Sequence, residues 1–95
     1  MNNWERMKAG RLYNADSKDL EKYHSFGMET CDKFNRTPLW MKKRKQRLLE
    51  KMIPSAKDGG AAIFAPFYCE YGVNIHFGKG CFVNYKCTFL DCAPI

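Results

Sequence analysis

Apolar residues recur at every sixth position through the last third of the chain. Steps of six from one alanine reach only apolar or aromatic residues: Ala65, Tyr71, Phe77, Val83, Phe89 and Ile95. The positions four residues further on are also apolar, and all but one are small: Cys69, Ile75, Cys81, Cys87 and Ala93. A strand alternates with a period of two and a helix has a period of 3.6, so neither explains this pattern. A six-residue period is typical of a parallel β-helix, in which each hexad supplies one short strand and a turn.

The repeat also predicts how its side chains pack. The first residue of each hexad should point into a narrow core, and the residue four positions later should face inward near a corner, where there is little room. Cys69, Cys81 and Cys87 occupy that tight position, so we interpret them as small core residues. Cys92 is out of phase with the repeat and is expected to face outward.

The chain has five cysteines, and none of them forms a C-x-x-C pair. An odd number in an intracellular chain favours free thiols over a disulfide scaffold. A zinc site is the alternative, although the spacing of its candidate ligands matches no zinc-binding knuckle. Those candidates are Cys69, His76, Cys81, Cys87 and Cys92.

Excess positive charge is confined to the first 60 residues. They hold 14 of the 16 Lys and Arg and 8 of the 10 Asp and Glu, and the net charge is +6. This shift in composition predicts two regions, a helical one over residues 1–60 and a repeat region over residues 61–95. No apolar run approaches the roughly 20 residues that a membrane helix needs, and no signal segment follows the N-terminus. We therefore expect a cytoplasmic protein without a membrane partner.

Helical spacing and capping residues predict two helices in the first 35 residues. A short helix over residues 4–9 should end at Gly10. A longer helix should begin after Asp16 or Ser17 as its N-cap and run to about Asn35. Gly27 lies within the apolar stripe of this second helix, where a missing side chain allows a neighbouring segment to approach closely.

Thr37 and Pro38 predict the start of a third helix, because threonine can cap it and proline suits its first position. This helix should run to about Ile53, stop at Pro54 and pack antiparallel to the second helix. Its basic run over residues 42–47 has two interpretations, a nucleic-acid patch or a solvated helix face. The solvated face is favoured, because the charges of a helical run point in different directions and no aromatic residues are interleaved with them.

Four segments of the chain carry a resemblance to a known family. They are Met7 to Asp16, Pro66 to Gly78, Phe82 to Cys87 and Leu90 to Pro94. In their order and spacing, the whole chain resembles the N-terminal half of the maltose/galactoside/nodulation-type sugar O-acetyltransferases, which are hexapeptide-repeat acyltransferases.

This resemblance implies an α+β fold, in which a helical Mac-type region precedes the first, incomplete coils of a left-handed parallel β-helix. Such enzymes transfer an acetyl group from acetyl-CoA to a sugar hydroxyl and form homotrimers with active sites between subunits. A histidine acts as general base on the acceptor hydroxyl, a task that neutral imidazole suits near pH 7.

The resemblance also implies five acceptor-binding residues. The family's acceptor-side asparagine corresponds to Asn84, and the acidic residue of its Asp-x-Ala-Pro stretch corresponds to Asp91. Asn14 and Asp16 fall in an N-terminal loop at the acceptor pocket, and Glu70 falls where the family often has Asp or Ser facing the sugar. Such groups would orient hydroxyls by hydrogen bonds.

The family's catalytic histidine lies in a Gly-His-Pro-type stretch downstream of Asp-x-Ala-Pro, and this chain ends before it. The coils that bind acetyl-CoA also lie beyond Ile95. His24 falls in a predicted helix and His76 in a structural stretch, so neither is expected to act as the base. We therefore expect a truncated acetyltransferase that is inactive alone. The alternative is a non-enzymatic capping partner of a full-length relative, which would dock through unpaired strand edges.

Overall fold

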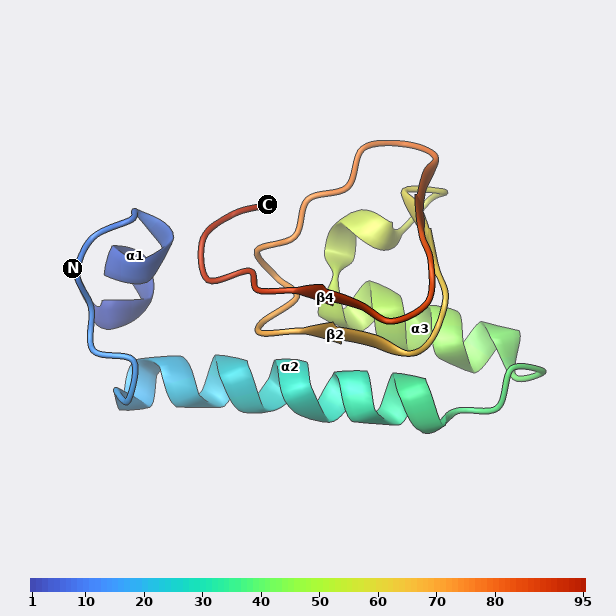
Figure 1. The fold of residues 1–95 in the computed structure, drawn as a ribbon, viewed down its shortest axis with the longest axis horizontal. Helices are drawn as coiled ribbons and strands as arrows, with labels where there is room; N and C mark the ends of the chain where they lie inside the picture. Colours follow the sequence, from blue (N-terminus) through green and yellow to red (C-terminus); the bar gives the residue numbers. More distant parts are fainter.

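A computed structural model describes all 95 residues and shows helices followed by short strands (Figure 1). This order confirms the fold class predicted from the sequence. The predicted division at residue 60 falls between the last helical turn and the first strand. The elements are α1 (Asn3–Lys8), α2 (Lys18–Arg36), α3 (Lys42–Met52), the 3₁₀ turn η1 (Pro54–Ala56), β1 (Ala61–Ile63), β2 (Phe67–Cys69), β3 (Cys81–Val83) and β4 (Cys87–Phe89).

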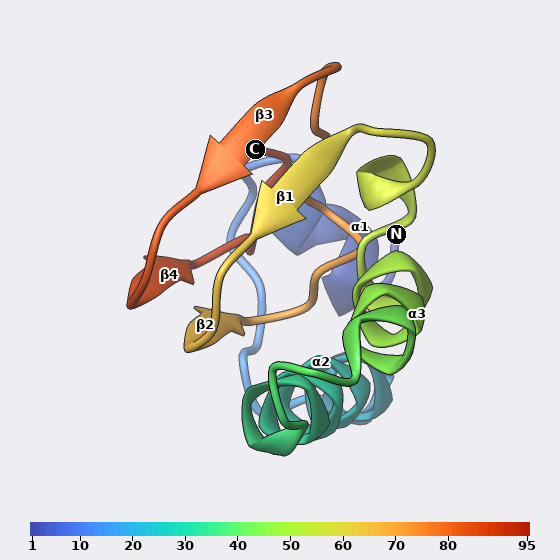
Figure 2. The same ribbon diagram turned by 90° about the vertical axis from the view of Figure 1, so that its right-hand side faces the viewer.

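The strands form two turns of a parallel coil, as Figure 2 shows from the end. β1 pairs in parallel with β3 and β2 pairs in parallel with β4, and paired residues are always 20 positions apart. A third side follows the same spacing, because Ile95 donates its N–H to Asn74 and accepts from the N–H of His76, both at 2.9 Å. Each turn of the coil therefore contains 20 residues.

The predicted unbroken period of six is wrong at one place. The positions that pair between the two turns step by six within each turn, through Ile63, Cys69 and Ile75 and then through Val83, Phe89 and Ile95. Val83 follows Ile75 by eight positions instead of six, because a glycine turn at residues 78–80 inserts two extra positions. Gly80 has a φ of +69°, a left-handed conformation that glycine adopts without strain.

This phase shift changes the neighbours of several residues. Tyr71, which the unbroken repeat placed in the coil core, packs instead in a separate cluster with Met7 and Leu20. Ile95 and Ala93 are exposed rather than buried. They lie on the second turn of the coil.

The burial of the cysteines also differs between the two turns of the coil. Cys69 on the first turn is buried, whereas Cys81 and Cys87 on the second turn are half-buried. Cys92 packs partly buried against the cluster of Tyr71 rather than facing solvent. No three of the His, Cys, Asp and Glu side chains are placed to hold a metal ion, so the zinc alternative finds no support.

Local sequence explains where α1 and α2 begin and end. The Asn2 side chain accepts a hydrogen bond from the Glu5 N–H at 2.8 Å and caps α1, and Gly10 follows its end with a φ of +74°. Ser17 is the N-cap residue of α2 as predicted, but its hydroxyl donates to Asp19 and makes no capping bond.

The predicted start of α3 is wrong by about one turn. Thr37 ends α2 instead, because its N–H and its hydroxyl both donate back to the Lys33 carbonyl. Pro38 opens a turn closed by the Met41 N–H, and α3 then begins at Lys42. α3 returns antiparallel along α2, as predicted (Figure 1). No helix is long and apolar enough to span a lipid bilayer.

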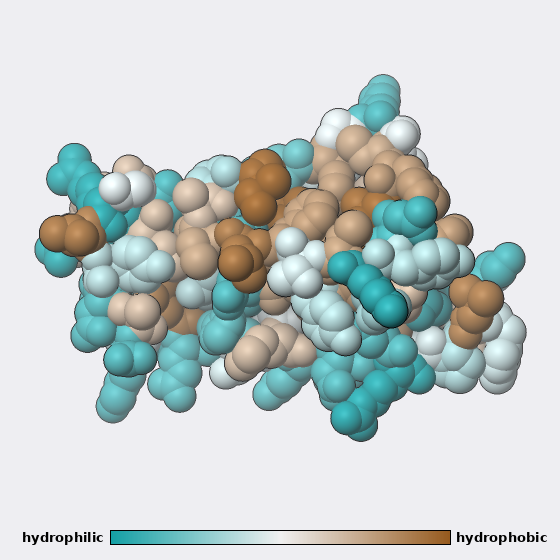
Figure 3. Space-filling model, viewed as in Figure 1, coloured by the Kyte–Doolittle hydropathy of each residue, from teal (hydrophilic) through white to brown (hydrophobic).

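One face of α2 runs along β2 in matching steps. Gly27 faces the backbone of residues 70 and 71, Cys31 faces Cys69, and Asn35 faces Phe67. Four residues of helix advance about 6.0 Å and two residues of strand about 6.6 Å, so contacts recur in register. The outer face of α2 is mostly hydrophilic, and hydrophobic surface gathers over the coil and the C-terminal segment (Figure 3).

At one end of this contact, the Asn35 side chain hydrogen-bonds to the backbone of β2 as a neighbouring strand would. Its amide donates to the Phe67 carbonyl at 3.0 Å and accepts from the Phe67 N–H at 2.9 Å. Asn35→Ala is expected to lower the free energy of unfolding by about 1–2 kcal/mol, because both backbone groups lose a partner. Urea unfolding followed by circular dichroism measures this. The exposed Lys33→Ala should change stability by less than about 0.5 kcal/mol, and equal losses for both variants would contradict the assignment.

Candidate functional site

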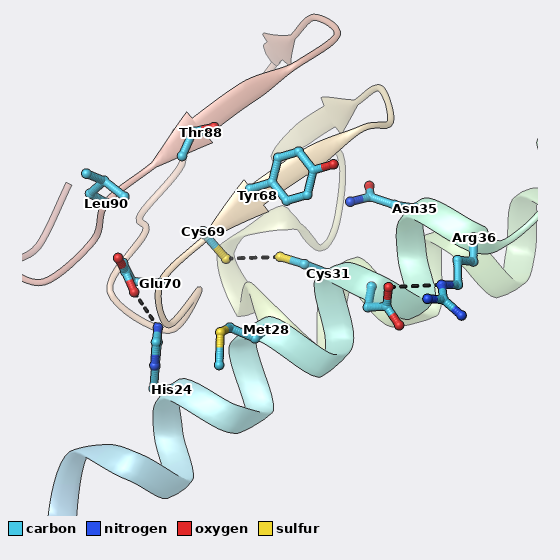
Figure 4. Close-up of a pocket in the computed structure, with 11 residues that line it drawn as sticks. His24, Met28, Cys31, Asn35, Arg36, Tyr68, Cys69, Glu70, Thr88 and Leu90 are labelled. Carbon is cyan, nitrogen blue, oxygen red and sulfur yellow. Dashed lines mark hydrogen bonds and ion pairs between the residues drawn. The ribbon is translucent and has the colours of Figure 1, made fainter. Parts of the chain in front are cut away.

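An open groove is lined by α2 on one side and by the paired strands β2 and β4 on the other (Figure 4). It encloses about 710 Å³. α2 lines it with His24, Met28 and Cys31, and the coil lines it with Tyr68 and Glu70, among others. The register between helix and strand positions these side chains, since α2 presents the same face to the coil along its length.

His24 and Glu70 meet across one end of this groove. The Nε2 atom of His24 pairs with a carboxylate oxygen of Glu70, and roughly a third of each side chain is exposed (38% and 31%). An exposed pair of this kind contributes only about 0–1 kcal/mol to stability, so its main effect is to orient both groups. Sequence reasoning treated His24 as a helical residue only. Its position between Leu20 and Gly27, at the edge of the apolar stripe, is the signal that places it near residue 70.

A second pocket of about 300 Å³ lies on the other side of His24. Asp16, Ser17 and Tyr71 line it together with His24. Glu70 and Asp16, two of the five predicted acceptor-binding residues, thus share His24 as a neighbour. Burial raises the pKa of the Tyr71 phenol to about 12, so this hydroxyl stays protonated at neutral pH and available as a donor.

Asn14 and Asn84 use their side chains in local turns. The Asn14 side-chain oxygen accepts from the Asp16 N–H at 3.0 Å, and the Asn14 N–H donates to the Asn3 side chain at 2.9 Å. These bonds shape the loop that carries Asp16. Asn84 is exposed in the turn between β3 and β4, where its oxygen accepts from the Tyr85 N–H at 2.8 Å, and it lines neither pocket.

Asp91 is fully buried and organises the backbone that carries Glu70. One carboxylate oxygen accepts from the N–H groups of Glu70 and Tyr71 at 3.1 and 2.9 Å. The other accepts from Gly72 and Asn74 at 2.7 and 3.3 Å. These four backbone N–H groups satisfy the buried carboxylate by hydrogen bonds, which offsets the cost of removing its charge from water. The position of Asp91 was anticipated from the resemblance, but this bonding role was not.

Chemically, the arrangement around His24 suits recognition of hydroxyl groups. Glu70 and Asp16 offer carboxylate acceptors, and Tyr71 offers a neutral donor. The structure brings these three groups around one imidazole and places Asp91 behind Glu70. The His76 side chain is exposed, and its backbone N–H donates to the Ile95 carbonyl in the coil.

Comparison with known proteins places this geometry in a family. Residues 6–57 match the maltose acetyltransferase hexapeptide capping motif, known as Mac. Nodulation protein L of Rhizobium leguminosarum bv. viciae is 33% identical, over 96% of this chain and 47% of its own length. The crystal structure of a maltose O-acetyltransferase from Clostridium difficile 630 superposes with a TM-score of 0.91 at 29% identity, covering 99% of this chain and 50% of that one.

A galactoside acetyltransferase solved in complex with coenzyme A shares the fold, with a TM-score of 0.81 at 23% identity over 99% of this chain and 46% of that one. The chain thus spans about half the length of the relatives it matches. The capping motif covers more than half of the chain, and the match continues through the parallel coil. The chain belongs to the Mac-capped hexapeptide-repeat family of sugar O-acetyltransferases.

Proposed function

We propose that this chain forms the N-terminal, acceptor-binding half of an acetyl-CoA-dependent sugar O-acetyltransferase. The observation that carries the proposal is the packing of the Mac helices on two turns of parallel coil, which superposes on a maltose O-acetyltransferase over nearly the whole chain. The acceptor is a sugar hydroxyl, acetyl-CoA is the donor, and the complete enzyme is a cytoplasmic homotrimer.

In this proposal the acceptor-side residues divide into two kinds. Glu70 and Asp16 hydrogen-bond sugar hydroxyls directly from the pockets on either side of His24. Asp91 acts through the backbone of residue 70, and Asn14 acts through the loop that carries Asp16. Asn84 lies in the turn between β3 and β4, outside both pockets, so its contact with the acceptor remains a prediction from the family resemblance. In this proposal the general base and the acetyl-CoA site belong to the half of the enzyme that residues 1–95 do not cover, because the chain spans about half the length of its relatives.

A chimaera tests this proposal directly. Residues 1–95 are fused in frame to the C-terminal half of the C. difficile maltose O-acetyltransferase, and acetylated maltose is measured by mass spectrometry. We expect product from the chimaera and none from residues 1–95 alone, because only the chimaera combines acceptor side, base and donor site. Glu70→Gln in the chimaera should lower kcat/KM about 10-fold or more through loss of a charged hydrogen bond.

The exposed Glu29→Gln serves as the matched control for Glu70→Gln and should leave kcat/KM unchanged. A folded chimaera without turnover would contradict the proposed function. Turnover by residues 1–95 alone would show that the base lies within them, and would overturn its assignment to the missing half.

The second candidate function is a non-enzymatic capping partner of a full-length relative. It is favoured by the second turn of the coil, where Cys81, Cys87 and Phe89 are only half-buried and β3 and β4 each pair with one strand. Co-elution of residues 1–95 with an intact relative in size-exclusion chromatography, with loss of that enzyme's turnover, would favour this function. Independent migration of the two chains would exclude it.

A further inference from the structure

Three sulfur atoms from three different elements meet beneath the groove. The Sγ atoms of Cys31 on α2 and Cys69 on β2 lie 3.6 Å apart, although 38 residues separate them in the sequence. The Sδ atom of Met52 lies 3.6 Å from each of them. All three side chains are buried, and Figure 4 shows the two thiols pointing at one another across the helix–strand contact.

Backbone packing on both sides holds the two thiols at this separation. One helical turn before Cys31, Gly27 lies so close to the coil that an added Cβ would be 2.6 Å from the Glu70 carbonyl oxygen. One turn after it, Asn35 makes two hydrogen bonds to the backbone of Phe67. Cys31 and Cys69 therefore face one another because α2 and β2 are fixed at both ends of their contact, not because two mobile side chains happen to touch.

The two thiols are chemically unequal. The hydrogen bond from the Cys69 thiol lowers the pKa of Cys31, and the same bond raises the pKa of Cys69. Either sulfur can be the donor in this bond, so once one proton is lost the pair is a thiolate beside a protonated thiol. The thiolate is the reactive form of cysteine toward peroxides and disulfides, and the lowered pKa favours Cys31 as the initial nucleophile of the pair.

The groove is the side of the molecule from which a small oxidant would approach this pair. Cys31 and Cys69 both line the groove, which has a volume of about 710 Å³, although the two residues are only 3% and 7% exposed. The other three cysteines are half-buried, and none of them lies in hydrogen-bonding distance of another thiol.

We propose that Cys31 and Cys69 form a reversible disulfide that ties the helical cap to the parallel coil. With hydrogen peroxide as the oxidant, the Cys31 thiolate attacks one oxygen to give a sulfenic acid and releases hydroxide. The Cys69 sulfur then attacks the Cys31 sulfur, forming the S–S bond and releasing water. In sum, two thiols and one peroxide give one disulfide and two waters. The sulfurs must approach by about 1.5 Å to reach the bond length of about 2.05 Å.

The bond would close a loop of 38 residues between the helical cap and the coil. Such a crosslink removes conformations from the unfolded chain, so the oxidised protein should melt about 10 °C higher than the reduced protein. The proposal concerns thiol chemistry and stands independently of the acetyl-transfer function, since neither thiol is assigned to the acceptor site.

Oxidation of the 95-residue chain by stoichiometric hydrogen peroxide tests the proposal. Tryptic digestion and mass spectrometry should find residues 23–33 linked to residues 58–79, with the loss of two hydrogen atoms. Dithiothreitol should reverse both the link and the rise in melting temperature. The wild-type chain alone decides the matter, so the test does not depend on whether a variant folds.

Two alanine variants sharpen the readout. Cys31→Ala should abolish the link and the rise in melting temperature, whereas Cys92→Ala should retain both. The proposal is overturned if Cys31 and Cys69 stay reduced, if either is oxidised to a sulfinic acid without a link, or if the link joins Cys81, Cys87 or Cys92 instead.

Discussion

Asp91→Ala is expected to lower the free energy of unfolding by about 3–5 kcal/mol. The side chain is fully buried and accepts hydrogen bonds from four backbone N–H groups. Its removal leaves several buried donors unpaired, each at a cost of about 1–3 kcal/mol that relaxation and water entry offset in part. A chain of this size has about 5–10 kcal/mol of total stability, so the variant should unfold at very low urea concentrations.

Two further variants separate the carboxylate from general effects of substitution. Asp91→Asn keeps the shape but turns one oxygen into a donor that faces backbone N–H groups, so it should lose about 2–3 kcal/mol. Asp58→Asn removes an exposed carboxylate and should be close to neutral, because asparagine also tolerates the φ of 53° at that position. If the Asp91 variants unfolded at the same urea concentration as the wild type, the buried carboxylate would not organise residues 70–74.

Gly27→Ala is expected to destabilise the chain by about 2–3 kcal/mol, although alanine is the better helix former by about 1 kcal/mol. An added Cβ would lie 2.6 Å from the Glu70 carbonyl oxygen and 3.0 Å from the Tyr71 Cα. Both are backbone atoms that cannot rotate away, so α2 and the coil would have to separate. Overpacking of this kind costs about 1–3 kcal/mol or more and outweighs the gain in helix propensity. Thermal unfolding measures the loss.

Gly78→Ala is the matched control for this substitution. An added Cβ at Gly78 meets nothing within 4 Å, so the change should be neutral or slightly stabilising. A Gly27→Ala variant as stable as Gly78→Ala would mean that α2 does not approach the coil as closely as the structure shows.

Much of the fold could be predicted, because it depends on local patterns. Helical spacing and caps predicted α1 and α2, and the six-residue period predicted parallel strands. The start of α3 was missed, because a Thr-Pro pair also suits the end of a preceding helix when the threonine bonds backward to Lys33. The two-residue insertion before Val83 was missed as well. Apolar residues still occur at every sixth position across the insertion, but different ones face the core on its two sides.

The candidate site was less predictable, because its contacts join residues far apart in the sequence. The resemblance supplied the positions Glu70, Asp91 and Asp16, but not the pairing of His24 with Glu70. No local spacing relates residues 24 and 70, and only the packing of α2 on β2 brings them together. The four backbone donors around Asp91 are equally invisible in a sequence, since they depend on how the chain turns after β2.

Native-state hydrogen exchange of two backbone amides tests most directly whether the helical cap and the coil form one cooperative unit, as the proposed function requires. The Gly72 N–H is bound by Asp91 at 2.7 Å, and the Phe67 N–H is bound by Asn35 of α2 at 2.9 Å. If cap and coil unfold together, both amides exchange only through global unfolding and report the same free energy as urea denaturation. Exchange of either amide at the rate of an exposed loop, while α2 remains protected, would contradict the account.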